Sequence, residues 1–321
     1  MRIVDIVRAS LLAVVLAAAF PAHAQYPDHP IKAIVPFPAG GGTDVFARLV
    51  SDRLGKVLGQ PVVIDNKGGA DGNIGMEAAA KSPPDGYTIL FNSSAATVNP
   101  ALYTKLRFDP AKELRPVAVL CEYYNLVVVN AEKVPARTLA EFIELLRKNP
   151  GKYNFASAGM GSAPHLAMEL WLRAAGVDLV HVPYQGSGPA MTDLVGGRVQ
   201  AAMDNVAAMP LIKSGKLRAL AITGSKRATA LPDVPTFAEA GLAEFEVTGT
   251  WGLIAPAGVP ADRVAILSDA LAKAVQDPAV RETLVAQGID PEAGTAAQYG
   301  ATLVRESDKW AKLIDDAKIK L

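Results

Sequence analysis

Apolar and polar positions along the chain predict an alternation of strands and helices. Short apolar runs bounded by glycine, proline or small polar residues are typical of buried strands. They occur at residues 31–35, 62–65, 87–91, 117–120, 126–129, 153–156, 180–182, 199–203 and 217–222, and a longer extended run covers 245–254. Segments with helical periodicity separate many of these runs. The pattern therefore predicts an α/β protein with parallel sheets flanked by helices.

The helical segments are recognised by apolar residues that recur every three or four positions. The first covers residues 45–58, where Phe46, Val50 and Leu54 fall on one stripe that is expected to face a sheet. Further helices are predicted at 74–81, 138–148 and 163–175. Residues 260–321 contain three more helical patterns and no predicted strand.

A glycine-rich turn, PFPAGGGTD at residues 36–44, joins the first predicted strand to the first predicted helix. Glycine allows positive φ and close approach to the backbone, while Thr43 or Asp44 is suited to cap the helix. Unsatisfied N–H groups at a helix start attract anions, and the helix dipole adds to this attraction. We therefore predict that this turn forms half of a carboxylate-binding cleft.

A second turn of the same design, SAGMGSAPHL at residues 157–166, follows the strand at 153–156. Other strand ends also deliver glycines and small polar residues, namely NKGGADGNIG at 66–75, Ser93, Ser94, Gln185, Asp204 and Asn205. In open α/β sheets, ligands bind beyond the carboxyl ends of the strands. These loops are therefore expected to gather around one site.

The order of the elements predicts two lobes. We interpret the polar interruption Glu122-Tyr123-Tyr124-Asn125 as a crossing into a second lobe, and the run at 245–254 as the return crossing. Lobe 1 is then discontinuous, with residues 25–122 plus 250–321, and lobe 2 covers residues 123–249. Two connecting segments form a hinge, which permits closure around a ligand.

Charge and cysteine content exclude several classes of protein. The 32 basic residues balance the 32 acidic residues, so nothing favours nucleic acid or an anionic membrane as a partner. The single cysteine, Cys121, excludes an internal disulfide, and its apolar surroundings predict a buried small hydrophobe. Because the chain also lacks clustered metal ligands and a phosphate loop, we expect no metal and no cofactor.

The first 24 residues predict export. Arg2 and Arg8 precede an apolar run at 11–20 that is short for a membrane span, and Ala22-His23-Ala24 resembles a cleavage site. Cleavage after Ala24 would leave a mature chain that begins at Gln25, without a cysteine for a lipid anchor. In a bacterium, this signal directs the protein to the periplasm. An uncleaved anchor is the alternative.

A secreted serine hydrolase is the competing functional hypothesis. Ser162 lies three residues before His165, but the G-x-S-x-G and H-E-x-x-H motifs are absent. Neighbours on one helical turn rarely have the geometry of a nucleophile and its base. The sequence therefore favours a binding protein over an enzyme.

Five segments stand out along the chain, namely PFPAGGGTD, NKGGADGNIG, SAGMGSAPHL, VPYQGSGPAMTDLVGG and TGTWGLIAPAGVP. Together they resemble the signature segments of the Bug-type substrate-binding proteins of tripartite tricarboxylate transporters. The resemblance covers essentially the whole mature chain and implies a type II periplasmic-binding-protein fold. It also implies a small carboxylate ligand, namely a di- or tricarboxylate, an acidic amino acid or an aromatic acid. The expected partners are the integral-membrane permease subunits of such a transporter.

Two further expectations concern the biological state of such a protein. We expect a monomer that captures its ligand by lobe closure and delivers it to the permease. A receptor that senses its ligand without transporting it is the alternative within the same class.

The resemblance also assigns the ligand-binding residues. In lobe 1 they are Phe37, Ala39, Gly40, Thr43 and Asp44, and in lobe 2 they are Ala158, Gly159, Ser162 and His165. Ser93, Ser94, Gln185, Asp204 and Asn205 lie at neighbouring strand ends and complete the predicted site. A carboxylate at Asp44 would repel a bound carboxylate, so its expected role is a helix cap, or an acceptor for a ligand amine or a water.

Overall fold

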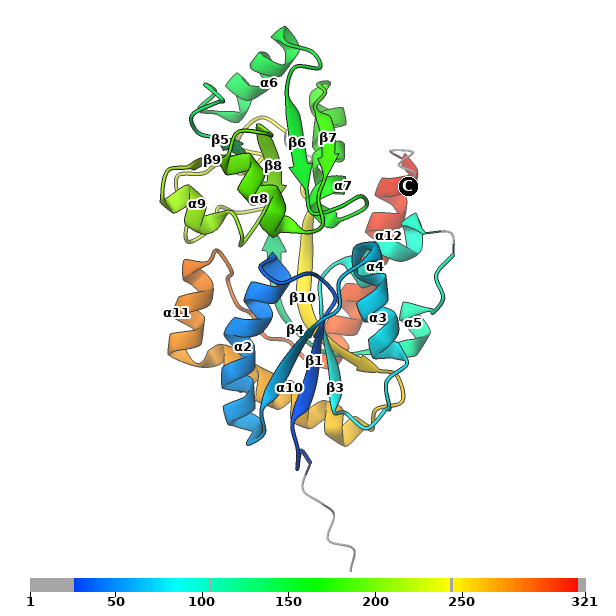
Figure 1. Cartoon of the computed structure of the whole chain (residues 1–321). Coiled ribbons are helices and arrows are strands. Elements are labelled where there is room, and N and C mark those ends of the chain that lie inside the picture. The colour runs from blue at the N-terminus through cyan, green and yellow to red at the C-terminus, as the bar shows by residue number, and fades with distance from the viewer. Residues whose placement is uncertain (1–25, 104, 243–244, 317–321) are drawn as a thin grey trace, which may run out of the picture.

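The computed structural model describes residues 26–103, 105–242 and 245–316, so the predicted signal peptide lies outside the described residues. Two lobes, each built around a five-stranded sheet, lie one above the other in Figure 1. The strands β4 (Leu114–Tyr124) and β10 (Thr248–Pro256) lie side by side at the centre of the molecule, where the lobes meet. This arrangement confirms the predicted α/β fold with two lobes.

The sheet of lobe 1 has the strand order β2-β1-β3-β10-β4. Its first three strands in the chain are β1 (Ile31–Val35), β2 (Val62–Asn66) and β3 (Thr88–Asn92). Strand β1 pairs in parallel with β2 and β3, whereas β10 pairs antiparallel with β3 and β4. The three parallel strands therefore end at the same edge of the sheet.

The sheet of lobe 2 follows the same plan, with the order β7-β6-β8-β5-β9. Its strands are β5 (Leu126–Asn130), β6 (Asn154–Ser157), β7 (Val180–Pro183), β8 (Ala201–Asp204) and β9 (Leu217–Ile222). Strand β6 is parallel to β7 and β8, and β5 is antiparallel to β8 and β9. In both sheets, the antiparallel strand beside the parallel trio is the one that follows a crossing from the other lobe.

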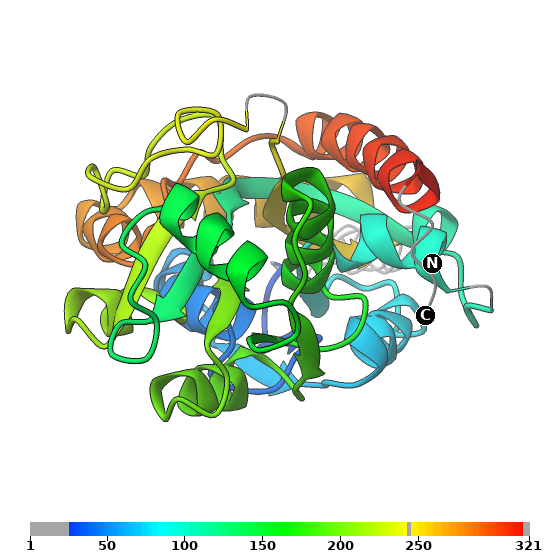
Figure 2. The same ribbon diagram turned by 90° about the horizontal axis from the view of Figure 1, so that it is seen from above.

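Helices cover both sheets. Those of lobe 1 are α2 (Gly42–Leu58), α3 (Asn73–Ala80), α4 (Ala95–Leu102), α5 (Pro110–Glu113), α10 (Ala261–Gln276), α11 (Pro278–Ala286) and α12 (Ala296–Asp316). Those of lobe 2 are α6 (Leu139–Lys148), α7 (Ala163–Ala175), α8 (Ser187–Val195) and α9 (Met209–Lys213). The three helices predicted after residue 260 are confirmed. Seen from above in Figure 2, α12 runs along one side of the molecule.

The start of α2 differs from the prediction. The helix begins at Gly42, its N-cap residue is the extended Gly41, and no side chain caps it. The prediction that Thr43 or Asp44 caps the helix was therefore wrong, because both lie inside the first turn. The glycine triplet makes this earlier start possible, since glycine is tolerated at the N-cap and Asp44 can reach back to the preceding loop. By contrast, Ser162 does cap α7, whose predicted bounds are confirmed.

The lobes touch one another beyond the hinge. Val206 of lobe 2 packs into the core of lobe 1, which also contains Phe46 and Trp251. In return, Trp310 and Ile314 near the end of α12 pack into the core of lobe 2. The chain crosses between the sheets at Asn125 and again before β10. Both crossings lie close to the expected lobe boundaries, and the exact residue numbers of those boundaries remain predictions.

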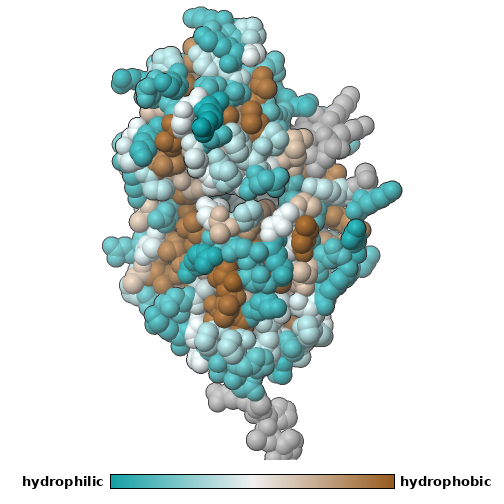
Figure 3. Space-filling view, in the orientation of Figure 1, coloured by the Kyte–Doolittle hydropathy of each residue, from teal (hydrophilic) through white to brown (hydrophobic). Residues whose placement is uncertain are grey.

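The single cysteine is buried, as its apolar surroundings predicted, and the exposed hydrophobic side chains form no large patch among the described residues. Cys121 is buried in lobe 1, and burial raises the pKa of its thiol. The large exposed hydrophobic side chains are scattered, at Val63, Ile74, Met160, Val180, Ile266 and Val304. Figure 3 shows the same on one face, where hydrophobic groups are separated by hydrophilic ones, as is ordinary for protein surfaces. Within the described ranges, no helix is both long and apolar enough to cross a membrane.

Candidate functional site

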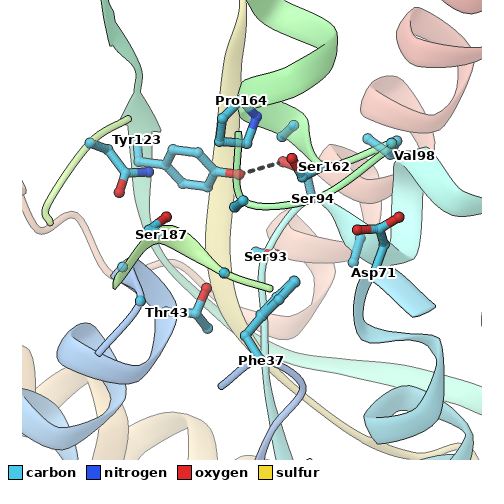
Figure 4. Close-up of a pocket in the computed structure, with 18 of the residues that line it drawn as sticks. Phe37, Thr43, Asp71, Ser93, Ser94, Val98, Tyr123, Ser162, Pro164 and Ser187 are labelled. Atoms are coloured by element: carbon cyan, nitrogen blue, oxygen red, sulfur yellow. Dashed lines mark hydrogen bonds between the residues drawn. The ribbon is translucent and has the colours of Figure 1, made fainter. Parts of the chain in front are cut away.

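A cavity lies between the two lobes and is lined by residues of both (Figure 4). It encloses about 680 Å³ of space free of protein atoms, part of which is open to solvent. Its lining from lobe 1 and the hinge strands is Phe37, Pro38, Gly41, Gly42, Thr43, Asp71, Ser93, Ser94, Ala95, Val98, Asn99, Tyr123 and Trp251. Its lining from lobe 2 is Ala158, Gly161, Ser162, Ala163, Pro164, Gly186, Ser187 and Asn205.

Four helices begin at this cavity, two from each lobe. In lobe 1 the lining includes the cap residues Gly41 of α2 and Ser94 of α4, and in lobe 2 the cap residues Ser162 of α7 and Gly186 of α8. The first backbone N–H groups of a helix have no partner within the helix, and the helix dipole places partial positive charge there. The cavity is therefore suited to an anion, although no lysine or arginine occurs in its described lining.

Aromatic side chains form one wall of the cavity. The Trp251 ring stacks on Tyr123, with ring centroids 4.5 Å apart, and on Phe46, at 5.0 Å. Trp251 Nε1 donates a hydrogen bond of 3.2 Å to Thr43 Oγ1, which joins β10 to the first turn of α2. Together with Phe37 this stack offers an apolar surface to the carbon skeleton of a small ligand.

The structure brings half of the predicted site residues to the inner cavity. Phe37, Thr43, Ser93, Ser94, Ala158, Ser162 and Asn205 line it. Gly159 and Gln185 line an adjoining, more open hollow that shares Phe37, Asp71 and Ala158 with the cavity. The remaining predicted residues, Ala39, Gly40, Asp44, His165 and Asp204, line neither space. Three of these residues, Asp44, His165 and Asp204, instead stabilise the loops around the cavity.

Asp44 is buried behind the glycine turn. Its carboxylate accepts hydrogen bonds from Arg48 Nε at 3.0 Å, from Gly40 N at 2.8 Å and from Asn66 Nδ2 at 2.9 Å. Burial alone would raise the pKa of Asp44, but these hydrogen bonds outweigh burial and lower the pKa. The charge of Asp44 is therefore matched by Arg48, and the carboxylate holds the turn in place.

His165 also faces away from the cavity. Its Nδ1 accepts the N–H of Gly161 at 3.0 Å, and its ring stacks on His181 with centroids 4.1 Å apart. Burial, with the neighbouring His181, lowers the pKa of His165 to about 4. The imidazole is neutral at physiological pH and fixes the turn that leads into α7.

Asp204 lies beneath the start of α8. It is fully buried, which raises the pKa of its carboxyl, and hydrogen bonds from the Ser187 hydroxyl and from backbone N–H groups act in the opposite direction. One of these is the N–H of Asn205, at 2.8 Å. Asp204 thus orients Ser187 and Asn205, two residues that do line the cavity.

Ser162 and His165 do not form a nucleophile and base pair. Ser162 Oγ donates to Gly159 O at 2.8 Å and accepts the backbone N–H of His165 at 3.4 Å. The ring atom Nδ1 of His165 is already occupied by Gly161. Among the residues that the structure describes, no group of three His, Cys, Asp or Glu side chains is placed to hold a metal ion.

Several lining residues were not predicted. Gly186 and Ser187 belong to the QGSG loop, which the sequence places at a strand end, so the position of that loop was the available signal. Asp71 lies in the NKGGADGNIG segment, with φ of 49°, a value uncommon for a residue other than glycine. Tyr123 belongs to the crossing strand β4, which pairs with β10, and it lines the cavity together with Trp251, whose place in the crossing run made an approach to the cleft foreseeable.

A cavity between two α/β lobes joined by two crossings, with helix starts from both lobes, defines a two-lobe solute-binding protein. The sequence matches the model of the tripartite tricarboxylate transporter family receptor over residues 46–319, and the chain belongs to this family. The resemblance to Bug-type proteins is thereby confirmed. The protein BugT of Bordetella pertussis is 40% identical over 299 residues, which cover 92% of this chain and 91% of BugT.

Two solved structures of similar proteins contain a carboxylate ligand. One is the Rhodopseudomonas palustris protein MatC with bound malate, with a TM-score of 0.83, 34% identity and coverage of 90% of this chain and 100% of MatC. The other is the protein Rpa4515 with adipate, with a TM-score of 0.88, 34% identity and coverage of 92% of this chain and 99% of that protein.

Proposed function

We propose that the protein is a periplasmic receptor that captures a small carboxylate between its lobes and delivers it to a membrane permease. The observation that carries this proposal is the convergence of four helix starts, from α2, α4, α7 and α8, on one cavity. The malate and adipate bound by similar proteins support a carboxylate as the ligand.

The free energies of the expected interactions indicate that both lobes are needed for micromolar binding of a carboxylate. A helix dipole contributes about 0.3–1 kcal/mol, or up to about 2 kcal/mol when partly buried, and a charge-assisted hydrogen bond about 1.5–3 kcal/mol. A micromolar dissociation constant requires about 8 kcal/mol net. One helix start is too weak to supply this after ordering costs, whereas donors from two opposed lobes are sufficient. Affinity is therefore coupled to closure of the lobes.

The predicted ligand-binding residues divide into two groups under this proposal. Thr43, Ser94, Ser162 and Asn205 line the cavity and are proposed to act directly, through backbone or side-chain polar groups. Asp44, His165 and Asp204 are proposed to act indirectly, by stabilising the loops that carry the cavity-lining residues. No chemistry is performed on the ligand, since Ser162 lacks a bonded base.

Ligand-dependent stabilisation tests the binding step. Protein refolded without ligand is heated with di- and tricarboxylates, acidic amino acids and aromatic acids in turn. We expect at least one to raise the free energy of unfolding by about 2.7 kcal/mol at a hundredfold excess over its dissociation constant. No response to any carboxylate contradicts the proposal. Hydrolysis of simple esters that disappears in Ser162→Ala would support the hydrolase instead.

The transport step needs its own test in cells. Deletion of the gene is expected to abolish uptake of the identified ligand, and a plasmid copy that includes residues 1–24 is expected to restore it from the periplasm. Unchanged uptake, together with an altered transcriptional response to the ligand, would favour the sensing receptor.

A further inference from the structure

Asp71 places a carboxylate in a cavity that is otherwise suited to an anion. It belongs to the loop between β2 and α3, within the short 3₁₀ turn η1 (Ala70–Gly72), and it lines both the inner cavity and the adjoining hollow. In the view of Figure 4, Asp71 and Ser187 lie on opposite sides of the cavity. The described lining contains no other acidic side chain and no basic one.

The structure holds Asp71 in place from two directions. Tyr103 donates its hydroxyl to Asp71 Oδ2 at 2.7 Å, and Asn99 Nδ2 donates to the Asp71 carbonyl oxygen at 2.9 Å. Both Ala70 and Asp71 have positive φ, of 48° and 49°, a conformation that persists only where the surroundings enforce it. The carboxylate is therefore positioned by neighbouring residues of the same lobe.

The other carboxylate oxygen faces lobe 2. A methyl group added at Gly159 would lie 3.0 Å from Asp71 Oδ1, so this oxygen lies against the turn that precedes α7. No hydrogen bond or ion pair from a described cation reaches Asp71, in contrast to Asp44 with Arg48. Burial raises the pKa of Asp71, although the hydrogen bond from Tyr103 opposes this effect. Asp71 thus lacks a cationic partner at the point where the lobes meet.

We propose that Asp71 selects carboxylate ligands that also carry an ammonium group, that is, amino acids and related amino carboxylates. The ligand carboxylate lies at the helix starts, and its ammonium group donates to Asp71 Oδ1. A ligand that presents only further carboxylates is disfavoured, because like charges in a site without a cation repel one another. This inference rests on the proposed carboxylate-binding function and names the ligand class within it.

The test compares ligands that differ in one substituent. Succinate, malate and aspartate share a carbon skeleton and differ by hydrogen, hydroxyl or ammonium, and glutarate, 2-hydroxyglutarate and glutamate form a second series. A third, aromatic series consists of methylbenzoate as the free acid anion (toluate), hydroxymethylbenzoate and aminomethylbenzoate. Dissociation constants are measured by calorimetry on refolded protein. We expect the ammonium member of the series that fits the cavity to bind about tenfold or more tightly than its hydroxyl and hydrogen counterparts.

Asp71→Asn is the decisive variant, because asparagine is nearly isosteric with aspartate and tolerates positive φ. It is expected to remove the preference for the ammonium member while leaving the affinity for the unsubstituted acid unchanged or improved. Asp52→Asn on the exposed side of α2 removes the same charge far from the cavity and is expected to keep the preference.

The outcomes separate the two proposals. If carboxylates bind but the ammonium member has no advantage, or if Asp71→Asn weakens all members of a series equally, the role of Asp71 is structural and the inference fails while the receptor function stands. If no carboxylate in any series stabilises the protein, the receptor function fails and the inference falls with it.

Discussion

The hydroxyl groups of Ser94 and Tyr123 lie 2.9 Å apart and form a buried hydrogen bond, drawn as a dashed line in Figure 4. Ser94 is the N-cap residue of α4, and Tyr123 lies near the end of β4, two residues before the crossing at Asn125. The bond therefore connects a helix start at the cavity to a strand of the hinge. Since both residues line the cavity, this hydrogen bond lies where the cavity borders the hinge.

Gly249 leaves room for the Ser94–Tyr123 hydrogen bond. It pairs with Tyr123 across β4 and β10, and a methyl group added to it would overlap with Ser94 Oγ and with the Tyr123 ring. We expect Gly249→Ala to lower the free energy of unfolding by about 1–3 kcal/mol, measured in urea, because one of these groups must move. Binding of the identified ligand is expected to weaken about tenfold in calorimetry.

Gly300→Ala in α12 is the matched control for Gly249→Ala. Its added methyl group would lie at an ordinary 3.4 Å from Pro116, and the backbone is helical. This control is expected to retain binding and to gain about 0.5–1 kcal/mol of stability. Equal behaviour of the two alanine variants would show that Gly249 is not constrained by the Ser94–Tyr123 bond.

A substitution at Gly42 tests whether the lobes must approach one another for the ligand to bind. A methyl group there would lie 2.5 Å from Asn205 Oδ1, which belongs to lobe 2, while its helical backbone suits alanine. We expect Gly42→Ala to obstruct closure and to weaken binding about tenfold or more, with little change in the unfolding midpoint. Small-angle X-ray scattering with ligand would show a less compact particle than the wild type.

Gly188→Ala adds a methyl group to the first turn of α8, where nothing lies within 4 Å, and Gly188 does not line the cavity. It is expected to bind and close like the wild type. If Gly42→Ala binds as tightly as Gly188→Ala, closure at Asn205 is not required for binding.

Asp44 and Asp52 allow a buried carboxylate to be compared with an exposed one on the same helix. Both pair with a basic residue four positions later, but the Asp44 side chain is 3% exposed and the Asp52 side chain 74%. We expect Asp44→Asn to cost about 1–3 kcal/mol, because Arg48 and the Gly40 N–H lose a charged acceptor. Asp52→Asn is expected to change stability little, since exposed pairs are solvated. Comparable losses in chemical denaturation would contradict the structural role of Asp44.

Because the pKa of Glu306 is raised in the folded protein, we expect the stability of the protein to depend on pH. Glu306 is buried on α12 and accepts a hydrogen bond from Thr97 Oγ1 at 3.4 Å. Burial raises the pKa of Glu306 to about 7 from the usual 4.5, and the hydrogen bond from Thr97 opposes this shift. Between pH 4.5 and 7 the folded protein binds more protons at this site than the unfolded chain. The stability contributed by protonated Glu306 is therefore complete below pH 4.5 and is lost as pH rises through 7.

Glu306→Gln isolates this contribution. The free energy of unfolding of the wild type, minus that of the variant, is expected to fall by up to about 3 kcal/mol between acidic and neutral pH and then to level off. Urea titrations at a series of pH values measure this difference. A difference that is flat across the range, or one that rises with pH, would show that Glu306 is ionised in the folded protein.

Local patterns were sufficient to predict the strands and many of the helices. Alternating apolar runs and helical stripes gave these elements to within a few residues, because burial on a sheet demands that periodicity. The helices α4, α5, α8 and α9 had no predicted bounds, and two of them, α4 and α8, begin at the cavity. The glycine turns at 36–44 and 157–166 were found because a strand that leads into a helix start is encoded in neighbouring residues.

Contacts between distant segments could not be predicted in this way. Asp44 and His165 were proposed as ligand-binding residues, yet both side chains turn away from the cavity, toward Arg48 and toward His181. Tyr123 and Asp71 line the cavity only because β4 pairs with β10 and because Asn99 and Tyr103 hold the η1 turn. The partners of Asp71 are 28 and 32 residues away in the sequence, so no local pattern reveals them. Arg48 is only four residues from Asp44, but that spacing alone does not show that the pair lies behind the glycine turn.

The proposed receptor requires helix starts from both lobes to bind one carboxylate. A crystal structure of the complex with the ligand identified in the stabilisation panel would show which helix starts contact it. We predict that the ligand carboxylate lies within hydrogen-bonding distance of backbone N–H groups at the start of α2 or α4 and that the same ligand also contacts the start of α7 or α8. A ligand held by one lobe alone, or bound outside the cavity, would contradict it.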